Sequence, residues 1–287
     1  MKRTNAATTQ ASPPSASTSY GPSALHRWDV NAERVSFVRP QLRAKSVRLD
    51  AQPQCIEIDV VRTVLIVVDM QNDFCHPKGW FGQRGLSLKA LLRPVAPLNA
   101  LLGPWREAGG KVLWLNWGVR PDRLNLGPTM QFKAKRTPDG VGYAEHSPED
   151  HGPSLVPGTW GAAVIDALPV LPEDMVVFKH RLSGFWDSEL DSVLRLQGAT
   201  TLLFAGVNTD RCVFSTLQDA NFLGYDCVLL EDVCSTVSPS YVSRAILYVV
   251  QQLHGLSPTP PPCWKGWPSS SLLLPRPNLN AVNLSDF

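Results

Sequence analysis

The chain has 287 residues, 44% of them hydrophobic and 18% charged, with a formal net charge of +2. This length and apolar content suffice for one or two domains with a sizeable core, which excludes an intrinsically disordered chain. Residues 51–255 carry 17 Lys and Arg against 21 Asp and Glu, so nucleic acid is not expected as a partner. No apolar run approaches the roughly 18 to 20 residues of a membrane helix, so we expect a soluble protein without a membrane partner.

The six cysteines bear on the compartment. None of them forms a CxxC pair, and no Cys/His cluster has the spacing of a structural zinc site. We therefore expect reduced thiols and a cytoplasmic protein. The first residues, rich in Ala, Thr, Ser and Pro, lack the apolar segment of a secretory signal. An organelle-targeting leader is the alternative to a disordered one.

Proline separates the two ends of the chain from its middle. Of the 25 prolines, 11 fall in residues 1–50 and 256–287, a composition typical of extended or disordered segments. We predict a disordered or extended leader over 1–54, one folded domain over 55–256 and a Pro/Ser-rich tail over 257–287.

Within the middle, apolar runs of strand length alternate with helical stretches. The expected strands are Thr63–Asp69, Lys111–Trp117, Met175–Lys179, Thr200–Gly206 and Asp226–Glu231. The expected helices are Leu92–Ala108, Ser188–Gln197, Cys212–Leu223 and a last one from Pro239 to about His254. Strands that are apolar throughout and separated by helices are typical of a parallel sheet covered on both faces. The sequence thus predicts an α/β fold, a three-layer α/β/α sandwich with a central, mainly parallel sheet.

A long segment without a regular pattern, residues 118–160, interrupts this alternation. Connections of that length inside a compact domain are usually functional. Ligands of open parallel sheets bind beyond the carboxyl ends of the strands, so the residues at those ends are the candidates for chemistry.

Three chemically competent residues fall at these ends. Asp69 ends the first predicted strand, Lys179 ends the third, and Cys212 follows the fourth at the start of a helix. The positive end of a helix and a neighbouring ammonium both favour a thiolate, so we expect the pKa of Cys212 to lie below the ordinary value of about 8.5. Cys212 is therefore the candidate nucleophile, and the N–H groups at the helix start are candidates for holding an oxyanion.

Each of these residues also has a plain structural interpretation. Cys212 could be a small buried hydrophobe, Lys179 a surface charge, and Asp69 the cap of a turn. Their joint position at the strand ends of one sheet favours the chemical interpretation.

Three sequence motifs contain these residues: VLIVVDMQNDFC at Val64–Cys75, VFKHRLSGF at Val177–Phe185 and GVNTDRCVFST at Gly206–Thr216. In content, order and spacing they resemble the motifs of the isochorismatase-like cysteine hydrolases, over about residues 58–255. The resemblance implies a three-layer α/β/α fold and a catalytic triad of Asp69, Lys179 and Cys212.

The same resemblance implies a cis peptide bond between Val207 and Asn208. That bond would aim the Asn208 N–H, together with the Cys212 N–H, at the oxyanion of an acyl-transfer reaction. Our mechanistic hypothesis is that Asp69 accepts the proton of Cys212, directly or after Lys179 has favoured the thiolate, and that the sulfur attacks an amide or ureide carbonyl to give a thioester.

Departures from related enzymes narrow the substrate. Nicotinamidases that resemble this group carry an Asp-x-His metal motif after the second strand, whereas this chain has Asn116-Trp117-Gly118 there and no His from this segment until His146. We therefore expect no metal and no cofactor. True isochorismatases lack the nucleophilic cysteine, so their reaction, the hydrolysis of a vinyl ether, is also disfavoured. The Asn116-Trp117-Gly118 segment and the long insertion look more similar to ureidoacrylate amidohydrolases and biuret hydrolases, which act on carbamoyl substrates.

Four residues are candidates for substrate binding. The Asn116 amide offers a donor and an acceptor to a ureido group, although a turn role is an equal alternative. Phe74, Trp117 and Trp186 could line a pocket, although aromatic side chains at strand ends more often serve packing.

The sequence therefore predicts a cysteine-dependent amidohydrolase that cleaves a C–N bond of a small amide or ureide, with the family's usual homo-oligomer, a dimer or tetramer. The alternative is a non-catalytic small-molecule binding or scaffold protein. It rests on the Pro-, Ser- and Asn-rich end of the chain after Leu256, where relatives continue into regular structure.

Overall fold

The computed structural model describes residues 17–39, 41–52 and 54–258. Its centre is a five-stranded sheet in the order β11-β10-β7-β8-β9, and every neighbouring pair is parallel. The strands are β7 (Thr63–Val68), β8 (Lys111–Trp117), β9 (Met175–Lys179), β10 (Thr201–Val207) and β11 (Asp226–Ser235). All five predicted strands are present. The last one is longer than expected and shifts register against β10 between Phe204 and Gly206.

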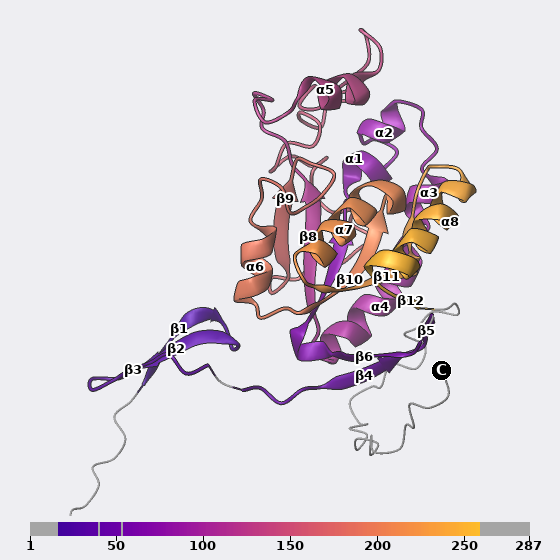
Figure 1. Cartoon of the computed structure of the whole chain (residues 1–287). Coiled ribbons are helices and arrows are strands. Elements are labelled where there is room, and N and C mark those ends of the chain that lie inside the picture. Colours follow the sequence, from indigo (N-terminus) through magenta and orange to yellow (C-terminus); the bar gives the residue numbers. More distant parts are fainter. Residues whose placement is uncertain (1–16, 40, 53, 259–287) are drawn as a thin grey trace, which may run out of the picture.

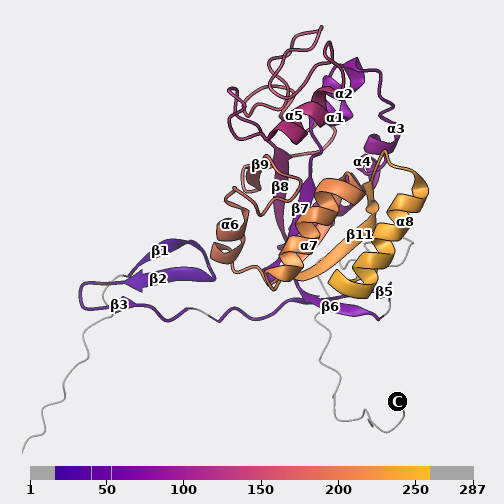
Figure 2. The same ribbon diagram turned by 45° about the horizontal axis from the view of Figure 1, so that its top comes forward.

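Helices cover both faces of this sheet, which confirms the predicted three-layer α/β/α fold. Figure 2 shows α7 and α8 side by side over one face, while α4 lies behind the strands. Four helices lie between β7 and β8: α1 (Asn72–Cys75), α2 (Trp80–Gln83), α3 (Lys89–Leu92) and α4 (Val95–Glu107). One helix follows each of the strands β9, β10 and β11: α6 (Leu190–Leu196), α7 (Phe214–Phe222) and α8 (Ser240–Val249). Among the described residues, no helix is long and apolar enough to cross a membrane.

The core lies where the apolar runs of the sequence placed it. Every residue of β7 and of β10 is buried, as is all of β8 except Lys111 at its start. Burial on both sides explains why these strands show no alternation of polar and apolar residues. The sheet is therefore covered on both faces, and the candidate residues lie at the carboxyl ends of its strands.

The leader forms more structure than its composition indicates. Residues 17–39 contain a small antiparallel sheet of β1 (Thr18–Ser23), β2 (His26–Val30) and β3 (Val35–Ser36), which projects from the main body in both views (Figures 1 and 2). It touches the body where the Ser23 hydroxyl donates to the Leu196 carbonyl over 2.7 Å.

A second part of the leader packs on the domain itself. Strand β4 (Ser46–Leu49) pairs with β6 (Ile56–Asp59), and β5 (Ala51–Gln52) pairs with β12 (Ser257–Pro258) near the other end of the described chain. Val47, Leu49 and Ala51 are buried. The packed body thus begins before residue 55, while the division of the chain into domains stays a prediction. The predicted tail lies outside the described residues except for Ser257 and Pro258.

The long insertion after β8 lies above the carboxyl ends of the strands, next to α1 and α2 (Figure 1). It contains one helix, α5 (Pro128–Lys135). The buried carboxylate of Asp73 anchors it, because Asp73 accepts the Leu155 N–H over 2.7 Å from the insertion and the Trp80 N–H over 3.0 Å from α2. One residue of the first motif therefore fixes the insertion over the sheet.

Gly206 is a position where the fold requires glycine. It has φ = +104°, and a Cβ there would lie 2.2 Å from the Val68 carbonyl oxygen of the neighbouring strand. We expect Gly206→Ala to lower the free energy of unfolding, measured by urea denaturation, by more than the roughly 1–3 kcal/mol of an unfavourable backbone conformation. Gly224→Ala is the matched control: φ is +90°, but no atom lies within 4 Å of the added Cβ. Equal losses in the two variants would show that the contact with Val68 is relieved without cost.

Candidate active site

Asp69 and Lys179 meet at the carboxyl ends of β7 and β9, two strands separated by β8. Lys179 Nζ donates to Asp69 Oδ2 over 3.0 Å, and the two side chains are 0% and 3% exposed. Asp69 has φ = +52°, a left-handed conformation that turns the chain out of β7 directly after its last residue. Lys179 Nζ also lies 4.1 Å from the centre of the Trp117 ring. The ammonium is thus held by a carboxylate and an aromatic face, away from water.

Cys212 joins this pair from the segment that follows β10. It lies in a single π-helical turn, Thr209–Val213, that precedes α7, rather than at the first residue of an α-helix. The residue is 7% exposed, and its thiol lies near enough to Asp69 and Lys179 for both to shift its pKa. The structure therefore brings together the three residues that topology alone placed at one edge of the sheet.

The expected thiolate is not supported by this geometry. Burial, followed by the negative charge of Asp69, raises the pKa of Cys212 to about 12, and the opposing effect of Lys179 is smaller. The prediction that the pKa lies below 8.5 is thus wrong, because it counted the helix and the lysine but neither burial nor the carboxylate. With Lys179 and Asp69 paired, a neutral thiol keeps the buried site uncharged, whereas a thiolate would leave one uncompensated charge.

Asp69 has the properties of a proton acceptor. Burial raises its pKa above the ordinary range, and the charge of Lys179 with hydrogen bonding to Cys212 offsets part of that effect. A carboxylate with a raised pKa next to a neutral thiol can take up the thiol proton when the sulfur attacks.

The peptide bond between Val207 and Asn208 is cis, as the sequence motif implied. Asn208 is 8% exposed, and its side-chain oxygen accepts the Val237 N–H over 3.2 Å and the Thr236 hydroxyl over 3.3 Å. Its carbonyl accepts the N–H groups of Arg211 and Val213. The loop before the cysteine is therefore fixed by bonds from both sides, while the oxyanion role of the Asn208 and Cys212 N–H groups stays a prediction.

Trp117 lies beside the three residues, as the substrate-binding prediction requires. Gln71 fixes it from both sides: Gln71 Oε1 accepts the Trp117 N–H and Gln71 Nε2 donates to the Trp117 carbonyl, each over 2.8 Å. The indole nitrogen of Trp117 is buried and has no hydrogen-bond partner among the described residues. A buried donor without a partner beside a possible substrate site is a candidate to bind substrate.

Tyr143 is a candidate site residue that sequence reasoning missed. Its ring stacks on Trp117, with centres 5.4 Å apart and an interplanar angle of 17°. Burial raises the pKa of its hydroxyl, and the charges of Cys212 and Asp69 act in the same direction. Tyr143 comes from the irregular insertion, where no periodicity could have identified it.

The other predicted binding residues are more dispersed. Phe74 is 7% exposed and packs edge-on against Phe81 at 4.9 Å. The Asn116 side-chain oxygen is buried and has no partner in the described part of the chain. Trp186 is 62% exposed, and its indole N–H donates to Asp219 over 2.7 Å. Trp186 lines a shallow groove with Arg181 and other residues, so its binding role is a prediction without a contact to the three clustered residues.

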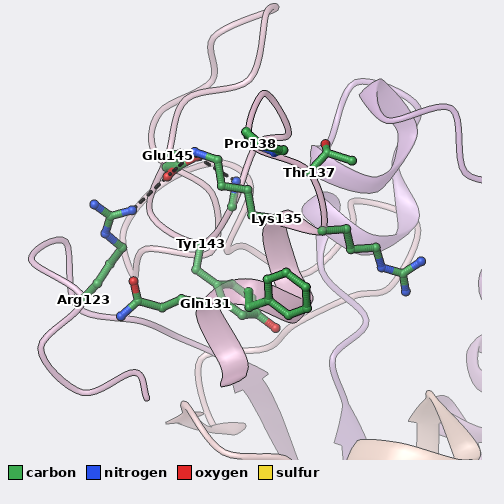
Figure 3. A pocket seen from close by; sticks show the side chains of 10 residues that line it. Arg123, Gln131, Lys135, Thr137, Pro138, Tyr143 and Glu145 are labelled. Atoms are coloured by element: carbon green, nitrogen blue, oxygen red, sulfur yellow. Dashed lines mark hydrogen bonds and ion pairs between the residues drawn. The ribbon is translucent and has the colours of Figure 1, made fainter. Parts of the chain in front are cut away.

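A cavity of about 310 Å³ opens into the insertion above Tyr143. Figure 3 shows Tyr143 at its centre, with Gln131, Arg123 and Glu145 on one side and Lys135 above. Within residues 17–39, 41–52 and 54–258, no three His, Cys, Asp or Glu side chains form a group that could hold a metal ion.

Comparison with known proteins identifies the family. The model of the isochorismatase domain matches residues 63–258. The ureidoacrylate amidohydrolase RutB of Rhizobium rhizogenes is 33% identical over 219 residues, which cover 76% of this chain and 89% of that protein. RutB of Methylobacterium radiotolerans is 34% identical, with 76% and 84% covered. The crystal structure of a cysteine hydrolase from Pseudomonas syringae pv. phaseolicola superimposes with a TM-score of 0.58 and 28% identity, over 70% of this chain and 89% of that one. The chain belongs to the isochorismatase domain family and is a hydrolase of that family.

Proposed function

We propose that this protein is a cysteine-dependent amidohydrolase that cleaves a C–N bond of a small amide or ureide. The observation that carries the proposal is the buried ion pair between Lys179 and Asp69, near enough to Cys212 for both residues to shift the pKa of its thiol. A nucleophile, a proton acceptor and a fixed positive charge are the parts that acyl transfer to sulfur needs.

The first half of the reaction forms a thioester. The Cys212 thiol gives its proton to Asp69 while its sulfur attacks the substrate carbonyl carbon. The carbonyl oxygen becomes an oxyanion, for which the N–H groups of Asn208 and Cys212 are the proposed donors; one such donor contributes about 10²- to 10³-fold to the rate. The C–N bond then breaks, the leaving nitrogen takes the proton from Asp69, and an acyl or carbamoyl group remains on the sulfur.

The second half returns the enzyme to its starting state. Asp69, again a carboxylate, accepts a proton from a water molecule as the water oxygen attacks the thioester carbon. The C–S bond breaks and the sulfur takes the proton back from Asp69. Lys179 keeps its charge throughout, and it stabilises both the carboxylate and the sulfur anion that forms on attack.

Two observations support a ureide as substrate. The similar proteins of Rhizobium and Methylobacterium are named ureidoacrylate amidohydrolases, and the alignments cover more than four fifths of each of them. Beside the ion pair, the indole N–H of Trp117 is a buried donor without a partner among the described residues. A carbamoyl group has an acceptor oxygen that could take this N–H.

A substrate panel tests the proposal. The purified protein is mixed with ureidoacrylate, biuret, N-carbamoyl amino acids, maleamate and nicotinamide, and ammonia is measured, released directly or by breakdown of carbamate. We expect turnover of at least one ureide at more than about ten times the rate with nicotinamide. Absence of turnover on every member of the panel would favour the non-catalytic alternative.

A further inference from the structure

The cavity above Tyr143 carries an excess of positive charge. Among its lining residues are three cations, Arg123, Lys135 and Arg136, and one acid, Glu145. Glu145 pairs with two of the cations, with Arg123 over 2.8 Å and with Lys135 over 3.2 Å (Figure 3). Arg136 forms no ion pair with any described residue. The cavity therefore has a guanidinium without a counter-charge.

A second arginine lies close to Arg136. Arg84 follows α2, and its Nη1 donates over 2.6 Å to the carbonyl of Ala134, two residues before Arg136. Its guanidinium lies over the Trp80 ring, 5.1 Å from the ring centre. Partial burial and then the charge of Arg136 lower the pKa of Arg84. The guanidinium groups of Arg84 and Arg136 are neighbouring like charges, and no described acid pairs with either. An anion would stabilise this arrangement.

Tyr143 connects this pair of arginines with the nucleophile. The tyrosine lines the cavity, stacks on Trp117, and its hydroxyl interacts electrostatically with Cys212 and also with Arg84. Trp117 in turn lies against the Lys179 ammonium, 4.1 Å from its ring centre, so two stacked rings connect the cavity with the ion pair beside the sulfur. A small substrate whose carbonyl group is at Cys212 would extend past Tyr143 toward Arg84 and Arg136.

We propose that Arg136, together with Arg84, binds a carboxylate at the far end of the substrate, so that the enzyme prefers acidic ureides to neutral ones. This inference rests on the proposed function for the identity of the substrate. The planar guanidinium suits a carboxylate, which accepts two parallel N–H bonds from it. Arg136 and Arg84 are then specificity residues that do not touch the scissile bond.

Binding without turnover tests the inference. In the Cys212→Ala background, isothermal titration measures the Kd of ureidoacrylate and of its uncharged methyl ester. We expect the acid to bind at least about tenfold more tightly than the ester. Addition of Arg136→Gln should lower this preference about 10- to 100-fold, the effect of losing hydrogen bonds to a charged group. Arg136 is exposed, so the variant should fold; Arg84→Gln, checked by thermal melting, should act in the same direction.

Arg120→Gln is the matched control, because Arg120 lies in the same insertion but pairs with Asp122 and does not line the cavity. It should keep the preference for the acid. Equal affinity for acid and ester, or a preference that survives Arg136→Gln, overturns the inference. Failure of the proposed function gives a different result: the wild-type protein would release no ammonia from any ureide, whatever the binding preference.

Discussion

Replacement of Cys212 with alanine should lower kcat/KM for the best ureide by about 10⁴- to 10⁶-fold, the range seen when the nucleophile is removed from a group of residues that acts as a unit. The other buried thiols of the described residues are not placed to substitute, because Cys75, Cys227 and Cys234 donate to backbone carbonyls and none of them pairs with Asp69 or Lys179. Ammonia release measures the loss, and a circular dichroism spectrum confirms that the fold is kept.

Cys227→Ala is the matched control for this experiment. Cys227 is also a buried cysteine next to the core, but its sulfur contacts the backbone oxygens of Leu217 and Tyr225 and no candidate site residue. This variant should keep kcat/KM within a few fold of the wild type. If Cys212→Ala retained more than about one hundredth of the activity, the thioester mechanism would be wrong, since a missing nucleophile cannot be replaced by binding alone.

Most of the fold could be predicted because its strands are buried on both faces. Continuous apolar runs such as Thr63–Val68, when helices separate them, predict the strands of a parallel sheet covered on both faces. All five predicted strands were found. The leader was harder, since β4 buries Val47 and Leu49 through pairing with β6. Two alternating apolar residues in a polar stretch give too weak a pattern to show which element they pack against.

The same contrast holds for the site. Asp69, Lys179 and Cys212 could be predicted to lie together because the carboxyl ends of parallel strands share one edge. Tyr143 could not, because it reaches the site from a loop whose path depends on the buried carboxylate of Asp73. The protonation state of Cys212 was also beyond sequence reasoning, since burial sets it and the helix start does not.

Replacement of Asp69 with asparagine should abolish turnover and at the same time make Cys212 more reactive. The loss of the proton acceptor should lower kcat by about 10²- to 10⁴-fold. The negative charge of Asp69 raises the pKa of Cys212 in the wild type and Lys179 lowers it, so the variant keeps only burial and the lysine. The pKa of Cys212 must then fall from about 12, and a thiolate paired with Lys179 becomes the neutral arrangement of the site.

Alkylation by iodoacetamide, followed by mass spectrometry, measures this change. In the wild type the rate at Cys212 should increase as the pH rises toward about 12, whereas in Asp69→Asn the increase should begin at lower pH. At pH 7 the variant should react at least about tenfold faster, because each unit by which the pKa falls multiplies the small thiolate fraction by ten. Cys55, which is exposed, serves as the internal standard.

The double variant Asp69→Asn/Lys179→Met separates the two charges. It lacks the ammonium that would stabilise a thiolate, so burial alone acts on Cys212 and alkylation should return to a slow rate, with turnover still lost. If Asp69→Asn left the alkylation rate at the wild-type value, Asp69 would not control the protonation of Cys212. If the double variant reacted as fast as the single one, the gain would come from better access to the sulfur, and Lys179 would have no part in stabilising its anion.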